Sequence, residues 1–338
     1  MMLLALLLAF SALLPAAPWP SVSPAKVGWS QAKLDEARRS SGAGGPGAVF
    51  ATVDGKALVA WGDVDQPRNV RSIRKSVVSA LIGQEIARGK LSLQATLADL
   101  GITERTPLTE MEGKATIADL LTSRSGVFLP AAYELPSNSA SRPARGTYSP
   151  GTVFHYGNWG FNVLGVIFEK TSGEDLYQAF ETRLATPLGM QDFRRPRDTR
   201  LRKEDVSLHP AHLFRLSPRD LARFVHLYLN EGRWGTHQVL PASWVAESTR
   251  PHVQVPRNPN GAHYGYLWWI YPQSERNPSL AFAVQGAGGA IGVAIPKLRL
   301  VFVFTQEAPD DRTNLAKLEA GRGWQLLQRI TTAAPPRF

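Results

Sequence analysis

Strand-like patterns of hydrophobic residues occur near both ends of the chain. Two short apolar runs, residues 48–53 and 57–61, flank Asp54-Gly55, a pair typical of a tight β-hairpin turn. Three more strand-like runs follow late in the chain, at residues 280–284, 291–295 and 300–305. Because short strands at the two ends need partners, we expect one antiparallel sheet built from both termini.

Helical spacing of apolar residues accounts for much of the remaining chain. Residues 31–39 have an apolar face and follow Ser30, a typical N-cap residue. The spacing turns helical again from Ser72 through Ala87, and Gly89 is placed to end that helix. We expect further helices at residues 116–121, 159–168, 176–184 and 218–230, and a last one from 314 to about 330.

The middle of the chain combines helices with long loops, and residues 128–152 are the most loop-like because they are rich in Pro, Ser, Ala and Gly. The predicted fold class is α/β of the α+β kind: an antiparallel sheet flanked by the terminal helices, plus an inserted mainly helical domain. We assign the sheet subdomain to about residues 26–70 and 235–338, and the helical subdomain to about 71–234. Together they form a single unit over residues 26–338.

The first 25 residues have the composition of a secretory signal peptide. They contain no charged side chain, and Leu3 to Leu14 is an apolar run interrupted only by Ser11. This run is too short to span a bilayer. We therefore expect a periplasmic or secreted protein with no stable membrane span after signal cleavage. The segment lacks a basic n-region, so an uncleaved anchor is the alternative, and the cleavage site is left open.

Composition excludes several kinds of chemistry. The 338 residues include no cysteine, which excludes disulfides, thiolate nucleophiles and Cys-ligated zinc or iron–sulfur sites. The two histidines of His209-Pro210-Ala211-His212 match no common zinc-site spacing. We therefore expect neither a metal nor an organic cofactor.

The net charge is +10, from 38 Lys and Arg against 28 Asp and Glu. Such a balance attracts anionic partners, and residues 194–203 are especially rich in Arg. This run lacks the interleaved aromatic residues typical of nucleic-acid surfaces. We therefore expect a solvated loop here and no nucleic-acid partner.

Ser72-Ile73-Arg74-Lys75 is the first candidate for catalysis. Residues three apart share a helix face, so the Ser72 hydroxyl and the Lys75 amine can meet. Serine becomes a good nucleophile when a neighbouring base takes its proton, and lysine is such a base only when its ammonium is destabilised. Burial, or a second cation such as Arg74 or Arg71, would destabilise it. The ordinary alternative is an N-cap serine followed by a solvated lysine.

The Ser-x-x-Lys spacing also occurs at Ser23–Lys26 and at Ser30–Lys33. The first of these copies lies in a Pro-rich segment, and the second begins an amphipathic surface helix. Only Ser72 begins an apolar helix suited to the centre of a domain. We therefore favour Ser72 over the other two serines.

Tyr156-Gly157-Asn158 is the second candidate. Tyr156 lies where a long loop meets a predicted helix, a place that presents side chains into clefts. A phenol there can transfer protons if neighbouring cations lower its pKa, and the Asn158 amide can hold Lys75 or a substrate carbonyl. The ordinary alternative is a core tyrosine with a satisfied hydroxyl.

The third candidate is Gln285-Gly286-Ala287-Gly288-Gly289, between two predicted strands. A glycine such as Gly286 lets a strand backbone approach a ligand closely. A free main-chain N–H in this segment would supply half of an oxyanion hole. A tight hairpin turn is the alternative.

In this order, the three motifs resemble those of serine β-lactamase-related hydrolases. That family includes class C β-lactamases, DD-peptidases, esterases and 6-aminohexanoate-dimer hydrolases. The resemblance runs from about residue 30 to residue 330. The other segments that match are Lys75–Gly83, Gly89–Leu93, Thr116–Val127, Pro150–Trp159, Leu164–Gly173, Leu216–Ala222 and the chain from Trp234 onward.

The resemblance implies a β-lactamase/transpeptidase-like fold with the site between the sheet and the helical domain. It implies that Ser72 is acylated, that Lys75 is the adjacent base and that Tyr156 transfers protons. The main-chain N–H groups of Ser72 and Ala287, the residue after Gly286, resemble the oxyanion hole. The implied activity is hydrolysis of ester or amide bonds in small-molecule or peptide-like substrates.

One departure from the family bears on the substrate. Penicillin-recognising relatives have Lys-Thr-Gly on the third strand, whereas Val284-Gln285-Gly286 stands at the matching place here. The missing Lys-Thr pair favours the esterase or amidase branch. A penicillin-recognising β-lactamase or DD-peptidase and a non-catalytic binder on the same scaffold are the alternatives. We expect pocket walls from residues 128–152 and 252–264, and these loops leave the acyl and leaving groups open.

Overall fold

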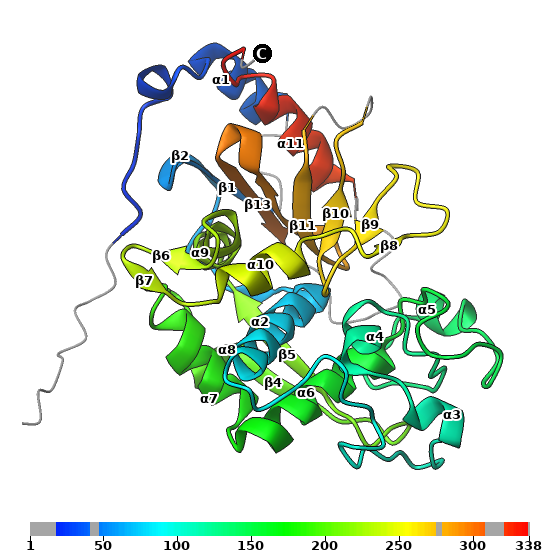
Figure 1. Cartoon of the computed structure of the whole chain (residues 1–338). Helices are drawn as coiled ribbons and strands as arrows, with labels where there is room; N and C mark the ends of the chain where they lie inside the picture. The colour runs from blue at the N-terminus through cyan, green and yellow to red at the C-terminus, as the bar shows by residue number, and fades with distance from the viewer. Residues whose placement is uncertain (1–17, 41–46, 275–278, 308–320, 337–338) are drawn as a thin grey trace, which may run out of the picture.

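The structure is a computed structural model that describes residues 18–40, 47–274, 279–307 and 321–336 (Figure 1). Its largest sheet has eight strands in the order β2-β1-β13-β12-β11-β10-β9-β8. The strands are β1 (Gly47–Val53), β2 (Lys56–Trp61), β8 (Val253–Gln254), β9 (His263–Tyr264), β10 (Trp269–Tyr271), β11 (Ala281–Gly286), β12 (Ala290–Ile295) and β13 (Leu300–Gln306). Neighbouring strands in this sheet are antiparallel, so the expected sheet built from both ends of the chain is confirmed.

The first strand joins the two ends of the chain. β1 pairs with the late strand β13 from Gly47↔Gln306 to Val53↔Leu300. The turn into β2 uses Asp54 (φ 49°) and Gly55 (φ 71°), both in the left-handed region that a two-residue hairpin requires. The predicted hairpin is therefore confirmed.

Helices cover both faces of the large sheet (Figure 1). The terminal helices α1 (Gln31–Ser40) and α11 (Arg322–Thr331) pack against each other, and α11 also packs on β13. The helix α9 (Pro218–Leu229) contacts β1, β12 and β13. The predicted flanking by terminal helices is confirmed, while α9 lies on the sheet although it comes from the stretch assigned to the helical subdomain. The start of the last predicted helix, residues 314–320, lies outside the described residues.

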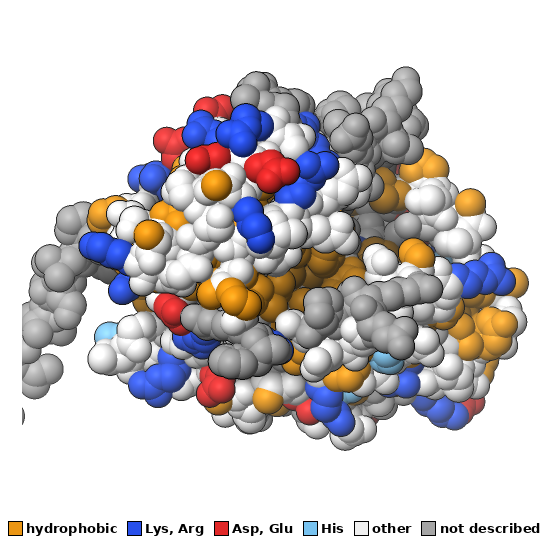
Figure 2. All heavy atoms as spheres, turned by 90° about the horizontal axis from the view of Figure 1, so that it is seen from above, with side chains coloured by type: hydrophobic (Ala, Val, Ile, Leu, Met, Phe, Trp, Pro, Cys, Tyr) orange, Lys and Arg blue, Asp and Glu red, His pale blue; other side chains and the backbone are white. Residues whose placement is uncertain are grey.

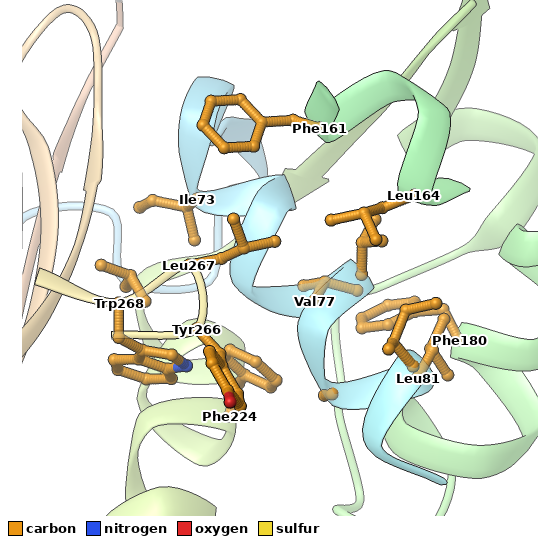
Figure 3. Close-up of a cluster of buried hydrophobic side chains, with 14 of the residues drawn as sticks. Ile73, Val77, Leu81, Phe161, Leu164, Phe180, Phe224, Tyr266, Leu267 and Trp268 are labelled. Carbon is orange, nitrogen blue, oxygen red and sulfur yellow. The ribbon is translucent and has the colours of Figure 1, made fainter. Parts of the chain in front are cut away.

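The helix α2 (Arg74–Ala87) occupies the centre of the molecule and follows a short 3₁₀ turn, η2 (Arg71–Ile73). All but two of its residues are buried, because apolar side chains surround it. Figure 3 shows Val77 and Leu81 of this helix packed among aromatic and aliphatic side chains from other elements. The predicted apolar helix from Ser72 to Ala87 is thus confirmed, and Gly89 follows it with φ 70°.

The remaining helical segments lie mostly around α2 and below the sheet in Figure 1. They are η1 (Pro24–Val27), α3 (Glu110–Gly113), α4 (Ile117–Leu121), α5 (Pro136–Ala140), α6 (Asn158–Ser172), α7 (Leu176–Phe180), η3 (Glu181–Ala185), α8 (Arg195–Asp198), α10 (Ala242–Ser248) and η4 (Pro296–Leu298). Every helix expected in the described part of the chain is present. The helices α3, α5, α8 and α10 were not expected, and α5 lies within residues 128–152, which were expected to be a loop.

A second sheet, which the sequence did not indicate, lies in the middle of the chain. Its order is β3-β5-β4, with β3 (Arg68–Asn69), β4 (Thr199–Arg202) and β5 (Ala211–Leu216); a separate hairpin joins β6 (Arg233–Trp234) to β7 (His237–Gln238). The expectation of a loop at residues 194–203 is wrong, because α8 and β4 occupy most of this run, while the expected solvent exposure is confirmed for all its residues except the buried Asp198. Strands of two to six residues are too short to show a clear alternation in sequence.

The residues just before α1 lie on the body of the protein. Trp19 donates from Nε1 to the Arg219 carbonyl (3.1 Å), and Ser21 forms a parallel bridge with Ala57. A chain that began at residue 26 would lack both contacts. Among the described residues, the structure has no helix that is both long and apolar enough to cross a membrane.

The face that carries the terminal helices has mixed charge. Figure 2 shows basic and acidic side chains interspersed there. The helix α1 carries charged residues of both signs, namely Lys33, Asp35, Glu36, Arg38 and Arg39. The excess positive charge is therefore not concentrated on this face.

Candidate active site

Ser72 lies in η2, on a turn with unusual backbone geometry. The preceding residue, Arg71, has φ 53°, in the left-handed region, and its N–H donates to Asn69 Oδ1 (2.9 Å). Gly286 of β11 lies directly against this turn, because a Cβ added there would come within 2.4 Å of the Val70 carbonyl oxygen. A glycine at this position therefore lets β11 approach the main chain just before Ser72.

The structure brings Ser72 and Lys75 together as their spacing predicts. Lys75 Nζ donates to Ser72 Oγ at 3.1 Å, and Lys75 is only 2% exposed. The ordinary alternative fails on both of its parts. Neither η2 nor α2 has a side-chain cap hydrogen bond, and the lysine is buried rather than solvated.

The surroundings of Lys75 favour its neutral form. Burial holds the pKa of Lys75 well below its usual value, and the neighbouring Arg74 guanidinium lowers it further, while Glu134 opposes the shift. The amine lies 3.9 Å from the ring centroid of Tyr156 and 4.2 Å from that of Phe161. Both causes expected from the sequence, burial and a second cation, are therefore present.

Arg74 is a buried cation with an unusual set of neighbours. It is 1% exposed and donates from Nη2 to Asn162 Oδ1 at 2.7 Å. No carboxylate of the described residues forms an ion pair with it, and burial lowers its pKa to about 10, so it remains charged at neutral pH. Placing a lone cation in the interior is costly, which is consistent with an electrostatic role at this site.

Tyr156 lies beside Ser72 and Lys75, at the predicted junction between a loop and α6. Burial raises the pKa of Tyr156 to about 12, and a hydrogen bond with Ser72 and the charge of Arg74 oppose this rise only in part. The Arg74 charge does lower the pKa of this phenol, as expected from the sequence, but burial raises it by more. Tyr156 holds its proton at neutral pH.

Asn158 lines the pocket at Ser72 but makes no hydrogen bond with Lys75. Its Nδ2 donates to the Tyr133 carbonyl at 2.6 Å. Its Oδ1 is buried and accepts no hydrogen bond from the described residues. An acceptor that is left unpaired in a pocket is available to a donor group of a ligand.

The glycine-rich end of β11 forms a hairpin turn and also approaches the turn that carries Ser72. β10 pairs with Ala281–Ala283 only, so Val284–Gly286 is unpaired on the side that faces η2. Ala287 then begins the turn into β12, where Gly288 (φ 84°) and Gly289 (φ 88°) are in the left-handed region. The segment is thus both a tight hairpin and a close approach to Ser72.

Ser72 and Ala287 line one small pocket of about 20 Å³. The other lining residues are Arg71, Arg74, Tyr133, Leu135, Asn138 and Asn158. Three of them come from residues 128–152, the loop expected to form a pocket wall. The other expected wall, residues 252–264, supplies none of these lining residues, although Tyr264 packs against the Tyr156 ring.

Tyr133 is a site residue that sequence reasoning missed. Its hydroxyl accepts from Arg71 Nη1 (2.7 Å) and from Asn69 Nδ2 (3.2 Å), and its φ of 61° is rare for a tyrosine. Tyr133 lies in a loop-like segment, where no regular spacing of residues marks it as part of a site. Only the folded loop brings it to Ser72.

The two histidines singled out in the sequence are buried structural residues. His209 Nε2 lies 2.8 Å from the Thr103 carbonyl oxygen, and His212 Nε2 lies 3.3 Å from Glu169 Oε1. Over the described ranges, no three His, Cys, Asp or Glu residues are grouped as metal ligands.

Comparisons with known proteins agree with this architecture. The Beta-lactamase family model matches residues 34–321. A comparison with curated protein sequences returns no match.

Several solved structures share the fold. "Putative 6-aminohexanoate-dimer hydrolase from Bacillus anthracis" is 20% identical, with a TM-score of 0.68 over 96% of this chain and 90% of that one. A penicillin-binding protein homolog from Caulobacter crescentus is 14% identical, with a TM-score of 0.64 over 89% of this chain and 97% of the other. EstCE1, a hydrolase with promiscuous acyltransferase activity, is 14% identical, with a TM-score of 0.62 over 88% of this chain and 98% of the other. Since the family model spans most of the sequence and these folds agree, the chain belongs to the Beta-lactamase family.

Proposed function

We propose that this protein is a serine hydrolase that cleaves ester or amide bonds through an acyl-enzyme on Ser72. The observation that supports it most is the buried Lys75 amine, whose pKa is lowered and which lies 3.1 Å from Ser72 Oγ. A neutral amine at this distance can take the hydroxyl proton as Ser72 attacks. The names of two structural relatives, "Putative 6-aminohexanoate-dimer hydrolase from Bacillus anthracis" and the hydrolase EstCE1, support the same class of reaction.

In the first half-reaction, Ser72 Oγ forms a bond to the substrate carbonyl carbon while Lys75 takes the hydroxyl proton, and the bond between that carbon and the leaving group then breaks to give the acyl-enzyme. Tyr156, which keeps its own proton at neutral pH, is the better donor to the leaving group. Lys75, whose amine lies over the Tyr156 ring, can then return its proton to the Tyr156 oxygen. In the second half-reaction, water attacks the acyl-enzyme and the same groups move protons in reverse, which releases the acid.

The oxyanion of the intermediate would be held by the main-chain N–H groups of Ser72 and Ala287. Both residues line the same pocket, and Gly286 brings the end of β11 against the turn that carries Ser72. Among the described residues, neither N–H donates to a backbone carbonyl. Two such donors aimed at one point stabilise the developing negative charge.

The substrate class follows from the end of β11. Val284-Gln285 stands where penicillin-recognising relatives have Lys-Thr, and Gln285 Nε2 donates to the Tyr271 hydroxyl at 2.7 Å. We expect hydrolysis of 4-nitrophenyl acetate or butyrate, with nitrocefin turnover at least tenfold slower in kcat/KM. The reason is that a β-lactam carboxylate loses a charge-assisted partner on β11, worth about 1.5–3 kcal/mol. Turnover of both substrates at pH 7 tests this, and nitrocefin as the better substrate would favour a β-lactamase.

A pH profile tests the role of Arg74. Since the Arg74 charge lowers the pKa of Lys75, Arg74→Met should raise that pKa and reduce the neutral fraction of the base at any given pH. The acidic limb of the plot of kcat/KM against pH should therefore move to higher pH. Arg74→Lys retains the positive charge and should shift the limb less. An unmoved limb in Arg74→Met would show that Arg74 does not tune the base.

A further inference from the structure

A second cavity lies on the small sheet, close to Ser72. It has a volume of about 280 Å³, near the lower end of the range of roughly 300–1,000 Å³ for small-molecule pockets. Its lining residues are Asn69, Arg197, Asp198, Thr199, Arg200, Leu213, Phe214 and Arg215. By contrast, the pocket at Ser72 is about 20 Å³, enough for little more than a reacting carbonyl group.

The strand register places two arginines on one face of this sheet. Arg215 on β5 lies opposite Asn69 on β3, and Leu213, two residues before Arg215, lies opposite Arg200 on β4. Side chains alternate along a strand, so these four residues share a face. The intervening Phe214 points the other way, and its ring packs against Phe180.

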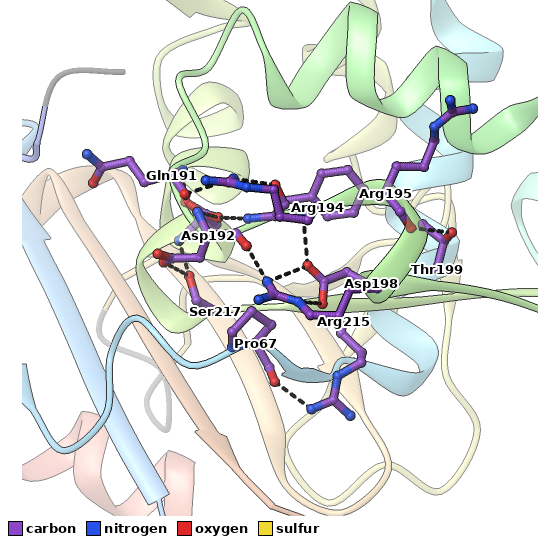
Figure 4. A network of polar contacts seen from close by, with 12 residues as sticks. Pro67, Gln191, Asp192, Arg194, Arg195, Asp198, Thr199, Arg215 and Ser217 are labelled. Carbon is purple, nitrogen blue, oxygen red and sulfur yellow. Dashed lines mark hydrogen bonds and ion pairs between the residues drawn. The ribbon is translucent and has the colours of Figure 1, made fainter. Parts of the chain in front are cut away.

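The cationic groups of this face are not neutralised within the described residues. Arg215 donates from Nη2 to the Pro67 carbonyl at 2.7 Å (Figure 4), and neither Arg215 nor Arg200 forms an ion pair there. Asp198, the carboxylate among the lining residues, is already engaged, because Arg197 donates to both of its oxygens (2.9 and 2.8 Å). Two guanidinium groups therefore remain for an anion from outside the protein.

Asn69 connects this cavity to the nucleophile. Its Oδ1 accepts from the Arg71 N–H and its Nδ2 donates to the Tyr133 hydroxyl, and both of these partners line the pocket at Ser72. The sequence distance between Asn69 and Ser72 is three residues, so the chain covers at most about 11 Å between them. Asn69 thus lines the larger cavity and holds two residues that line the small pocket.

We propose that the cavity of Arg200 and Arg215 is an anion subsite of the active site, which binds a carboxylate carried by the substrate. This inference rests on the proposed serine hydrolase function. The small pocket takes the scissile carbonyl, and the larger one takes the acidic part of the molecule. Guanidinium groups suit a carboxylate because they donate two parallel hydrogen bonds to its oxygens. The substrate class is therefore a small acidic ester or amide.

The test compares acidic and neutral esters of similar size. kcat/KM is measured for two pairs of esters. Mono-4-nitrophenyl glutarate, with the acid on the acyl side, is compared with 4-nitrophenyl butyrate, and 4-butyryloxybenzoate, with the acid on the leaving group, is compared with its neutral methyl ester. We expect at least one acidic ester to be preferred over its neutral partner by about tenfold or more. The double variant Arg200→Met/Arg215→Met should lower that preference by about tenfold. Arg202→Met is the matched control, since Arg202 lies on the same strand outside the cavity and pairs with Glu204.

Glutarate binding separates a failure of this inference from a failure of the proposed function. Calorimetry on Ser72→Ala, which needs no turnover, should show glutarate binding that weakens about tenfold when Arg200 and Arg215 are also replaced. If no ester is hydrolysed but glutarate binds in this way, the proposed reaction fails and the anion site stands. If neutral esters are hydrolysed but neither the acid preference nor the glutarate affinity depends on the two arginines, the anion subsite is refuted.

Discussion

Replacement of Ser72 by alanine should abolish ester hydrolysis, lowering kcat by about 10⁴-fold or more, as expected for loss of a nucleophile. The mutation removes the oxygen that would form the acyl-enzyme and leaves Lys75 without its hydrogen-bond partner at 3.1 Å. Covalent labelling by a fluorophosphonate should disappear with it. Release of 4-nitrophenol and gel fluorescence of the labelled protein measure the two effects.

Ser30→Ala is the matched control, because Ser30 and Lys33 have the same spacing. Lys33 donates instead to the Thr332 carbonyl at 2.9 Å and lies at the surface. This variant should keep both turnover and labelling. Since Ser72 makes no cap hydrogen bond, its replacement should leave the circular dichroism spectrum unchanged. Undiminished labelling of a folded Ser72→Ala protein would remove Ser72 from the mechanism.

Conversion of Lys75 to arginine should lower kcat by about 10²–10⁴-fold, the range for loss of a positioned base. Arginine keeps the positive charge but does not give up its proton at neutral pH, because its pKa exceeds about 12. The proton of Ser72 then has no acceptor at this position. Stopped-flow measurement of the acylation rate distinguishes this loss from a change in substrate binding.

Arginine is also larger than lysine, and the Lys75 amine is enclosed by the rings of Tyr156 and Phe161. Lys75→Ala avoids steric disruption by a larger side chain, and it leaves space for an added amine. Methylamine should then restore part of the lost rate, with a pH dependence that follows the neutral amine. Lys33→Arg serves as the control for a lysine at the same spacing. Near-normal turnover of Lys75→Arg would transfer the role of base to another group, most simply Tyr156.

The pair at the centre of the site was predictable because its geometry is local. Ser72 and Lys75 lie on one helix face because they are three residues apart, and the apolar residues that follow indicate that the helix is buried. The hairpin at Asp54-Gly55 and the late strands were predictable for the same reason, since turn residues and alternation are read within short windows.

Features made by distant parts of the chain were not predictable from patterns. Tyr133 reaches the site from a loop, and its contacts with Arg71 and Asn69 depend on a backbone conformation that the sequence does not signal. The small sheet joins strands of two to six residues that lie far apart in sequence. Its cavity follows from that pairing, so the Arg-rich run appeared to be a solvated loop. For Tyr156, charge alone suggested a lowered pKa, whereas the depth of burial raised it.

The most direct test of the central claim is to locate the covalent adduct. The purified protein is treated with a fluorophosphonate, digested, and its peptides are sequenced by mass spectrometry. The proposed mechanism predicts one modified residue, Ser72, with the adduct mass on its side chain and none on Ser30 or Tyr156. An adduct on a different residue, or an unmodified Ser72 in protein that hydrolyses 4-nitrophenyl butyrate, would contradict it.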